Sequence, residues 1–510
     1  MAGTVPVAAS LSSIYTPDVL RVQKSRWSSL LGQFESTFSG PATFVSRSPG
    51  RVNIIGEHID YSLYGVLPMA IAADALLAVS AIPTSSSSGE AAFELANLKA
   101  ERFPQRSFVL AEANDWDVEI DASVLEWTNY FKSGLRGALE LLRQKKGDGF
   151  VPVGMKVLMD GTVPVGGGLS SSAAFVSASA LAVLYVNGVT EVDKTELTEL
   201  AIVSERAVGV NSGGMDQSAS VLSLAGSALH VDFVPTLKAT PVKMPETDPE
   251  LVVLIAQSFV SADKHVMGPI HYNLRVVECS LAAAFLDAGV NGGGGLPKDS
   301  SPLEVSLRGF HLKYFSGKEK DPMEELKELL ALADKTLIKD GYTREEIAEK
   351  LGTSVLELEK TFMSRFPVRA DKFKLRQRAM HVFTEAVRVL QFLELLKTSP
   401  PGCEKELGRL MNETQDSCRD LYECSCPELD EICAIARRNG SLGSRLTGAG
   451  WGGCSVHLVP GDKVQSVKEA WDKEYYAKMA LSREQRGAAV VASKPGSGSM
   501  LFLVKEGSLE

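Results

Sequence analysis

The stretch GRVNIIGEHIDY, residues 50–61, joins a strand-like run to a group of ionisable side chains. Its first half is rich in β-branched residues and bounded by glycines, which predicts a strand. Arg51 lies inside this run, and Glu57, His58 and Asp60 follow directly after the second glycine. This group of donors and acceptors indicates a polar partner at the end of the strand.

The overall composition is that of an ordinary globular protein. At 510 residues, with 45% hydrophobic and 23% charged residues, the chain is long enough for two large domains. Its formal net charge of -10 argues against nucleic acid as a partner. The densest basic cluster, from Arg365 to Arg378, alternates with apolar residues as a solvated helix face does.

Cysteine usage and apolar runs indicate the compartment. The seven cysteines are odd in number and form no CxxC pair, which is typical of reduced thiols. The longest apolar run, residues 173–186, is too short to span a membrane and predicts a buried helix. The N-terminus lacks the pattern of a secretory signal. We therefore expect a cytoplasmic protein that does not bind membranes.

Strand and helix patterns both occur along the chain, which predicts an α+β fold. We expect an N-terminal part over residues 1–245 and a mostly helical C-terminal part over 246–510, with a flexible insertion near 287–322. The expected strands cover residues 42–56, 69–82, 151–159, 252–258, 455–460 and 499–504. The expected helices cover residues 17–38, 191–208, 272–287, 323–338, 344–362 and 370–397.

The loop VPVGGGLSSSAA, residues 163–174, has the features of a phosphate site. Three glycines allow close approach of the backbone, and three serines stand where a helix begins, so that its free N–H groups and positive dipole end face an anion. A single serine would suffice for a helix cap, so the pattern favours phosphate. The residues are Gly166, Gly167, Gly168, Ser170, Ser171 and Ser172.

Two better-known phosphate motifs do not apply. The chain has no GxxxxGK[ST] loop. The string GAGWGG at residues 448–453 matches GxGxxG, but a strand-like run follows it where a dinucleotide fold requires a helix. We expect these glycines to bring a turn close to another part of the site.

Asp216 follows two glycines in the stretch GVNSGGMDQSAS, residues 209–220. An aspartate in a glycine turn usually caps or forms the turn. Here it accompanies a phosphate loop and the ionisable group of residues 50–61. Together these three elements predict a kinase for a small hydroxylated molecule.

At these residues the chain resembles a known family. GRVNIIGEHIDY is similar to the signature of galactokinases, and VPVGGGLSSSAA is similar to the ATP loop of the wider GHMP small-molecule kinases. SGGMDQSAS and RLTGAGWGGC resemble two further motifs, and all four occur in the family's order. The resemblance covers nearly the whole chain and implies a two-lobed GHMP kinase fold with the active site in the cleft between the lobes.

The resemblance also implies roles for the residues. Glu57, His58 and Asp60 would bind sugar hydroxyls. Arg51 would lie beside the anomeric hydroxyl and Asp216, keep that carboxylate ionised to receive the hydroxyl proton, and stabilise charge on the transferred phosphoryl group. Both Arg51 and Asp216 would therefore contact the substrate.

Three further features follow from the same resemblance. Ser172 and Glu205 would hold Mg²⁺, with ATP as co-substrate. Tyr272 corresponds to a tyrosine that contacts sugar in many galactokinases, or it is a core aromatic of its helix. The family's usual Ser-His pair is replaced here by Thr414 and Gln415, so any role of that histidine is lost here or was never catalytic.

The expected activity is phosphorylation of D-galactose at the C1 hydroxyl by a monomeric enzyme. Two alternatives stay open: an N-acetylgalactosamine 1-kinase, and a non-catalytic sensor that binds galactose and ATP. The intact serine-rich loop argues against the sensor. A mevalonate or homoserine kinase fits less well, because those substrates offer no ring of hydroxyls to the carboxylates of residues 57–60.

Overall fold

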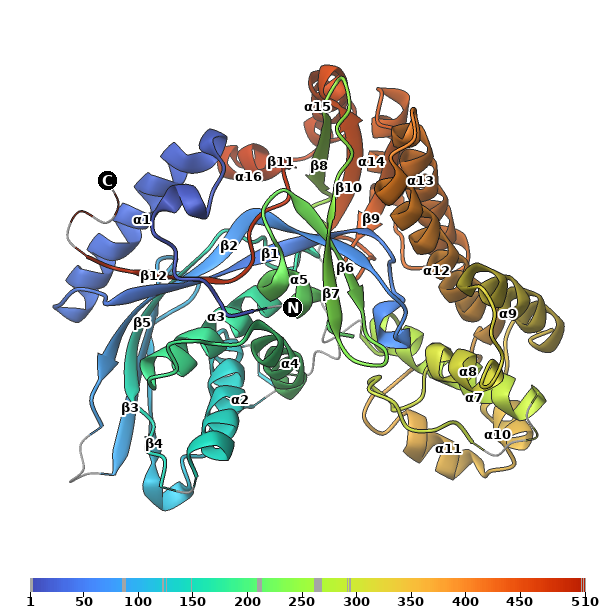
Figure 1. Ribbon diagram of the computed structural model, residues 1–510, viewed down its shortest axis with the longest axis horizontal. Coiled ribbons are helices and arrows are strands. Elements are labelled where there is room, and N and C mark those ends of the chain that lie inside the picture. Colours follow the sequence, from blue (N-terminus) through green and yellow to red (C-terminus); the bar gives the residue numbers. More distant parts are fainter. Residues whose placement is uncertain are drawn as a thin grey trace.

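The computed structural model describes most of the chain, and Figure 1 shows it as a ribbon. The described residues are 3–84, 89–121, 123–124, 126–147, 149–208, 213–260, 268–290, 292, 295–505, 507 and 509.

Twelve strands form a six-stranded sheet, a four-stranded sheet and a two-stranded ribbon within the described residues. The six-stranded sheet has the order β12-β1-β2-β5-β3-β4, the four-stranded sheet β11-β8-β10-β9, and the ribbon pairs β6 with β7. The strands are β1 (Phe44–Ile55), β2 (Leu67–Ile82), β3 (Glu90–Asn97), β4 (Arg106–Ala111), β5 (Gly154–Gly161), β6 (Ser227–Asp232), β7 (Lys238–Lys243), β8 (Leu251–Gln257), β9 (Gly443–Thr447), β10 (Cys454–Pro460), β11 (Val490–Ser493) and β12 (Met500–Leu503).

Helices cover both sheets and form most of the C-terminal part. They are α1 (Pro17–Phe38), α2 (Thr128–Lys146), α3 (Ser171–Val186), α4 (Lys194–Glu205), α5 (Met215–Leu222), α7 (Tyr272–Val290), α8 (Leu307–Tyr314), α9 (Pro322–Thr336), α10 (Arg344–Leu351), α11 (Val355–Phe362), α12 (Leu375–Thr398), α13 (Cys403–Asp420), α14 (Pro427–Arg438), α15 (Val464–Glu474) and α16 (Arg483–Ala488).

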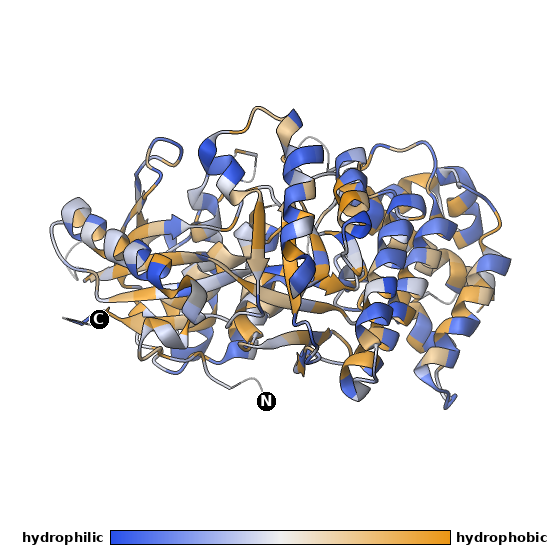
Figure 2. Cartoon of the chain, turned by 90° about the horizontal axis from the view of Figure 1, so that it is seen from above, coloured by the Kyte–Doolittle hydropathy of each residue, from blue (hydrophilic) through white to orange (hydrophobic). Residues whose placement is uncertain are grey.

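Strand β1 lies between β12 and β2 in its sheet and is buried along its whole length. Helix α1 covers one face of its sheet, where Trp27, Phe34 and Phe502 belong to one buried cluster. Helices α2 to α5 cover the other face (Figure 1). In Figure 2 the strands of this lobe are largely apolar, and the helices alternate polar and apolar residues. The expected α+β fold is confirmed.

Helix α3 follows the glycine loop and is almost entirely buried, as expected for the apolar run at 173–186. No helix in the described part of the chain is long and apolar enough to cross a membrane. The run instead packs against β1 and α2, and the loop before α3 is bonded to β1, because the Arg51 N–H donates to the Leu169 carbonyl at 3.1 Å.

The last strand corrects the expected lobe boundaries. Strand β12 pairs antiparallel with β1, with Phe44 opposite Leu503 and Arg47 opposite Met500. The C-terminal part therefore does not extend to the end of the chain, because its last strand belongs to the sheet of the N-terminal lobe. A short strand pattern gives no information about its partner, so the sequence did not predict this return.

Two helix expectations also need correction. The segment expected as a flexible insertion, residues 287–322, contains the end of α7 and the whole of α8, with Leu307 and Phe310 fully buried. The helix expected over 344–362 is two helices, α10 and α11. Gly352, at a φ of +65°, ends the first, and the Ser354 side chain caps the second.

Candidate active site

The turn that follows β1 carries the predicted sugar-binding residues. Gly56 has a φ of +97°, and a Cβ there would lie 3.0 Å from the Cα of Val66, so a glycine is required where the chain leaves the strand. His58 is also left-handed, at a φ of +58°. A 3₁₀ turn, η2 (Asp60–Ser62), completes the loop. We call residues 56–66 the sugar turn.

The C-terminal lobe holds the sugar turn through buried polar side chains. Glu385 of α12 accepts hydrogen bonds from the backbone N–H groups of Gly56 at 2.7 Å and Glu57 at 3.0 Å. His381, one helical turn earlier, bonds the Glu57 carbonyl at 2.9 Å. Both side chains are fully buried. The position of the turn therefore depends on the packing between the lobes.

The Glu57 carboxylate takes part in the same interface. Its Oε2 atom accepts hydrogen bonds from Arg445 of β9 and from the backbone N–H of Gly448, the latter at 3.2 Å. Burial raises the pKa of Glu57, and the Arg445 guanidinium opposes this shift. One carboxylate oxygen thus joins the lobes, and sugar binding by Glu57 stays a prediction.

The His58 ring is held from both sides. Its Nε2 atom lies 3.0 Å from the Ala449 carbonyl, and its Nδ1 atom lies 3.0 Å from the Tyr61 hydroxyl. A carbonyl can only accept, so Nε2 donates to Ala449. Both ring nitrogens have partners within the protein. The role of His58 as a sugar ligand therefore also stays a prediction.

Asp60 and Asp216 form a pair of carboxylates at the centre of the site. Burial raises the pKa of Asp60 to about 6, and the charge of Asp216 adds to the shift. A Cβ at Gly213 would lie 2.6 Å from the Asp60 carboxylate, so the glycine before α5 lets the two segments meet. Residues 209–212 of this motif lie outside the described residues.

Arg51 contacts Asp216 directly, as the resemblance implied. Its Nε atom donates to Asp216 Oδ1 at 2.7 Å, and its Nη1 atom donates to the Gly168 carbonyl at 2.6 Å. Arg51 is buried, and the Asp216 side chain is 19% exposed, so the carboxylate can be reached from outside. One guanidinium thus joins the carboxylate to the glycine loop.

The glycine loop packs against the turn between β9 and β10. A Cβ at Gly448 would lie 2.3 Å from the Gly168 carbonyl oxygen, and a Cβ at Gly168 would lie 2.8 Å from the Thr447 carbonyl oxygen. Neither position can carry a larger residue without movement of the backbone. The expectation that the glycines of residues 448–453 bring a turn close to the site is confirmed.

The start of α3 has the properties of an anion site. Ser170 precedes the helix at a φ of +61°, and its side chain makes no capping hydrogen bond. Its Oγ atom is buried and has no hydrogen-bond partner within the described part of the chain. The N–H groups of the first helical turn, from Ser171 onward, have no partner inside the helix. These groups favour a negatively charged ligand in front of the loop.

Tyr272 begins α7 and lies at the sugar turn. Its ring centroid lies 5.7 Å from that of His58 and 5.6 Å from that of Tyr61. Burial raises its pKa well above the usual value, and the charges of Asp60 and Asp216 contribute. Tyr272 also packs against the main hydrophobic core, so its role as a sugar contact stays a prediction.

Glu205 ends α4 and is fully buried. It accepts a hydrogen bond from the Gln217 amide of α5. Its charge contributes to the raised pKa of Tyr272, so it lies on the same side of the molecule as the paired carboxylates. No group of three or more His, Cys, Asp or Glu side chains among the described residues is arranged to bind a metal ion.

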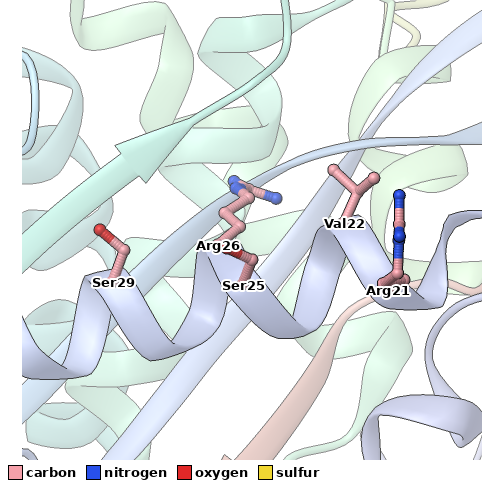
Figure 3. A pocket seen from close by; sticks show the side chains of 5 residues that line it. All are labelled: Arg21, Val22, Ser25, Arg26 and Ser29. Carbon is pink, nitrogen blue, oxygen red and sulfur yellow. The ribbon is translucent and has the colours of Figure 1, made fainter.

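A separate pocket lies along α1, away from these residues (Figure 3). Its lining comes from one face of that helix. Arg26 in this lining already pairs with Asp74 and Asp160 at 2.5 Å each. The lining residues are Arg21, Val22, Ser25, Arg26 and Ser29. This pocket does not contain any of the predicted site residues.

Thr414 and Gln415, which replace the family's Ser-His pair, are buried behind the site. The Thr414 hydroxyl donates to Glu385 at 2.8 Å. The Gln415 amide accepts from the Leu446 N–H at 2.7 Å and donates to Asp430 at 2.8 Å. Both side chains therefore support the elements that hold the sugar turn and the β9–β10 turn.

Comparisons with known proteins first define the class. The model of the GHMP kinase N-terminal domain matches residues 129–223, which include the glycine loop, and that of the C-terminal domain matches residues 392–478. The structure of a Methanococcus jannaschii mevalonate kinase has a TM-score of 0.51 at 17% identity, with 89% of this chain and 98% of that chain covered. The fold is that of a GHMP small-molecule kinase.

More specific matches identify the family. The galactokinase galactose-binding signature matches residues 32–81. The chain is 40% identical to a galactokinase of Schizosaccharomyces pombe, covering 99% of each chain, and 41% identical to one of Saccharomyces cerevisiae, covering 93% and 94%. A Lactococcus lactis galactokinase complexed with galactose has a TM-score of 0.64 at 23% identity, covering 93% and 99%. The chain belongs to the galactokinase family.

Proposed function

We propose that this protein transfers the γ-phosphoryl group of ATP to the C1 hydroxyl of D-galactose, which gives galactose 1-phosphate and ADP. The observation that carries the proposal is the contact between Arg51 and Asp216, 2.7 Å, directly beside the glycine loop. Full-length relatives named galactokinases support galactose as the acceptor.

In this mechanism Asp216 is the general base. Its carboxylate accepts the proton of the attacking hydroxyl, and Arg51 orients it through the 2.7 Å hydrogen bond. The same guanidinium stabilises negative charge on the transferred phosphoryl group. Asp60 and Tyr272 orient the sugar, and the exposed edge of Asp216 allows contact with it. The N–H groups at the start of α3 hold the phosphates.

Mg²⁺ bound by Ser172 and Glu205 would neutralise charge on the phosphates of ATP. A hydroxyl and a carboxylate are the hard oxygen donors that Mg²⁺ prefers. The chemistry of these two side chains therefore fits the ion. Glu205 is fully buried, and the Gln217 amide donates to its Oε2 atom, which holds the carboxylate in place.

We expect Ser172→Ala and Glu205→Gln to raise the Mg²⁺ concentration needed for the half-maximal rate. The reason is that each variant removes one proposed ligand while the sugar turn is unchanged, so the KM for galactose should stay near its original value. Ser177→Ala is a matched control, because Ser177 lies on the same helix in the core. Equal Mg²⁺ dependence in all three variants would contradict the metal assignment.

The pKa of Asp60 predicts a pH dependence of sugar use. Because that pKa lies near 6, above the usual 3.8, the carboxylate becomes protonated below about pH 6 and accepts fewer hydroxyl protons. We expect kcat/KM for galactose to fall below pH 6, by about tenfold per pH unit. In Asp60→Asn this inflection should be absent. An unchanged inflection in the variant would assign it to another group.

A panel of sugars with purified protein and Mg-ATP tests the proposed function. ADP formation and the position of the phosphate should be read together, and we expect galactose to have the highest kcat/KM with product phosphorylated on C1. A tyrosine ring and hydroxyl at position 272 would fill space that a 2-acetamido group needs, and this favours galactose. A higher value for N-acetylgalactosamine would change the substrate, and sugar binding without ADP formation would indicate a sensor.

The proposal includes a monomeric, cytoplasmic enzyme that binds neither nucleic acid nor membranes. The acidic net charge of -10 argues against nucleic acid as a partner, and seven free cysteines are typical of a reducing compartment. Light scattering coupled to size-exclusion chromatography tests the monomer, since a mass near 55 kDa is expected from the 54.8 kDa chain.

A further inference from the structure

Helix α8 lies within residues 287–322, outside the segments that the three family models match. It is nevertheless firmly packed, with Leu307 and Phe310 fully buried. Ser306 caps its first turn, and Lys313 pairs with Asp287 of α7 at 2.8 Å. This helix therefore has a fixed position relative to α7, and it can hold a side chain of the sugar turn in place.

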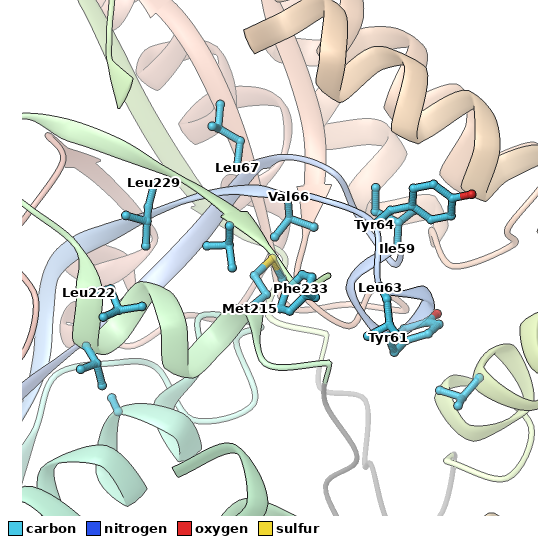
Figure 4. Packing of buried hydrophobic residues seen from close by; sticks show 14 of the residues in the cluster. Ile59, Tyr61, Leu63, Tyr64, Val66, Leu67, Met215, Leu222, Leu229 and Phe233 are labelled. Carbon is cyan, nitrogen blue, oxygen red and sulfur yellow. The ribbon is translucent and has the colours of Figure 1, made fainter. Parts of the chain in front are cut away.

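One side chain of the sugar turn reaches α8. The Tyr64 hydroxyl lies 3.0 Å from Nδ1 of His311, and His311 Nε2 lies 2.8 Å from Oε2 of Glu325 on α9. Tyr64 and His311 are both buried. In Figure 4 the Tyr64 ring points away from the Tyr61 and Leu63 side chains. The turn is thus attached to two helices of the segment that follows α7.

The hydrogen bonds that join Tyr64, His311 and Glu325 are consistent with one tautomer of His311. Glu325 as a carboxylate only accepts, so Nε2 carries the proton and Nδ1 accepts from the Tyr64 hydroxyl. Arg308 Nη1 lies 2.9 Å from the same Nδ1 atom and shares its single lone pair with the Tyr64 hydroxyl, and the guanidinium lies 5.5 Å from the centre of the Tyr64 ring. Tyr64 is therefore held through both its hydroxyl and its ring.

The backbone connects Tyr64 rigidly to the sugar ligands. The Tyr64 N–H donates to the Ile59 carbonyl at 3.1 Å, and the Leu63 N–H donates to the Asp60 carbonyl at 2.8 Å. Leu63 is left-handed, at a φ of +63°. Displacement of Tyr64 would therefore shift Ile59 and Asp60, because these hydrogen bonds close a tight turn between them.

We propose that Tyr64, His311 and Glu325 are positioning residues of the galactose site, so that α8 and α9 set the position of Asp60 without touching the sugar. The inference rests on the proposed function, because it assigns Asp60 to sugar binding. It gives the segment around α8 a role in substrate affinity and none in nucleotide binding.

The test compares two variants that each remove one tyrosine hydroxyl. One hydroxyl joins the sugar turn to α8, and the other joins α8 to α9. Tyr64→Phe breaks the contact with His311. Tyr314→Phe is the matched control, because the Tyr314 hydroxyl of α8 donates to Glu328 of α9 at 2.9 Å and does not contact the sugar turn. We expect Tyr64→Phe to raise the KM for galactose about three- to tenfold while the KM for ATP is unchanged. Tyr314→Phe should change neither constant.

Amide hydrogen exchange provides a readout that needs no activity. We expect faster exchange at residues 59–64 in Tyr64→Phe and unchanged exchange there in Tyr314→Phe. Equal exchange in the two variants, or a parallel rise of both KM values, would overturn the inference. If the unaltered protein does not phosphorylate galactose, the proposed function fails, and the exchange result still decides whether the link positions the turn.

Discussion

Asp216→Asn should lower kcat by roughly 10² to 10⁴ while the protein keeps its fold and its affinity for galactose. The amide oxygen can still accept the hydrogen bond of Arg51, so the local structure is preserved. The amide cannot receive the hydroxyl proton, and this is the step that the carboxylate supplies. The measurement is kcat at saturating galactose and Mg-ATP, with galactose binding followed by calorimetry.

Asp160→Asn is the matched control for this variant. Asp160 is a largely buried aspartate that also pairs with a single arginine, Arg26, but on the α1 side of the sheet. The Asp160→Asn variant should lose the ion pair with Arg26, and its kcat should stay near that of the original protein. Near-native kcat in Asp216→Asn would remove Asp216 from the mechanism.

Arg51→Ala should also lower kcat, and its effect should not add to that of Asp216→Asn. Both residues act on the same proton transfer, so the double variant should be about as slow as the slower single variant. A fully multiplicative loss would show that Arg51 and Asp216 act in separate steps. In that case the guanidinium would act mainly on the phosphoryl group.

Local patterns in the sequence were sufficient for the elements that carry the site. The strand of residues 42–56, the glycine loop and the helix after it were all predicted, because apolar periodicity and glycine clusters act over a few residues. The meeting of residues 448–453 with the glycine loop was anticipated from their glycines alone. What these predictions lacked was the set of side chains that hold the sugar turn in place.

Those side chains could not be found by motif, because each lies more than 300 residues from its partner. One signal was available. His381, Glu385 and Arg388 recur at four and three residues in the predicted helix of residues 370–397, so they share one face. Polar residues interspersed with a core-facing apolar pattern indicate a buried polar network. Arg445 in β9 had no such signal, and neither did the pairing of β12.

Glu385 is the residue of this network with the most contacts. Besides the two backbone N–H groups of the sugar turn, it pairs with Arg388 at 2.7 Å and accepts from the Thr414 hydroxyl at 2.8 Å. Burial alone would raise the pKa of Glu385, but Arg388, together with His381 and Arg445, lowers it to about 2. The carboxylate is thus charged and fully buried, and both of its oxygens accept hydrogen bonds.

Glu385→Ala should destabilise the protein by about 3 to 5 kcal/mol, because it leaves a buried guanidinium without its partner and two N–H groups without an acceptor. We also expect the KM for galactose to rise by about tenfold or more, since Glu57 loses its support. Glu278→Gln is a suitable control. Glu278 is equally buried and pairs with Arg378 and the Lys374 N–H, but does not contact the sugar turn.

The pH dependence of stability separates the charge of Glu385 from its shape. Its pKa in the folded protein lies below the usual 4.5, so its charge stabilises the fold above about pH 4.5, and this contribution is lost as the pH falls from 4.5 toward 2. The isosteric Glu385→Gln should therefore lower the free energy of unfolding at pH 7 and have a weaker pH dependence between pH 5 and 3. Denaturant unfolding at pH 7, 5 and 3 measures the free energy of unfolding of the variant and of the original protein. If the variant and the original protein lose stability in parallel over that range, the carboxylate of Glu385 is not the group that fixes the sugar turn through its charge.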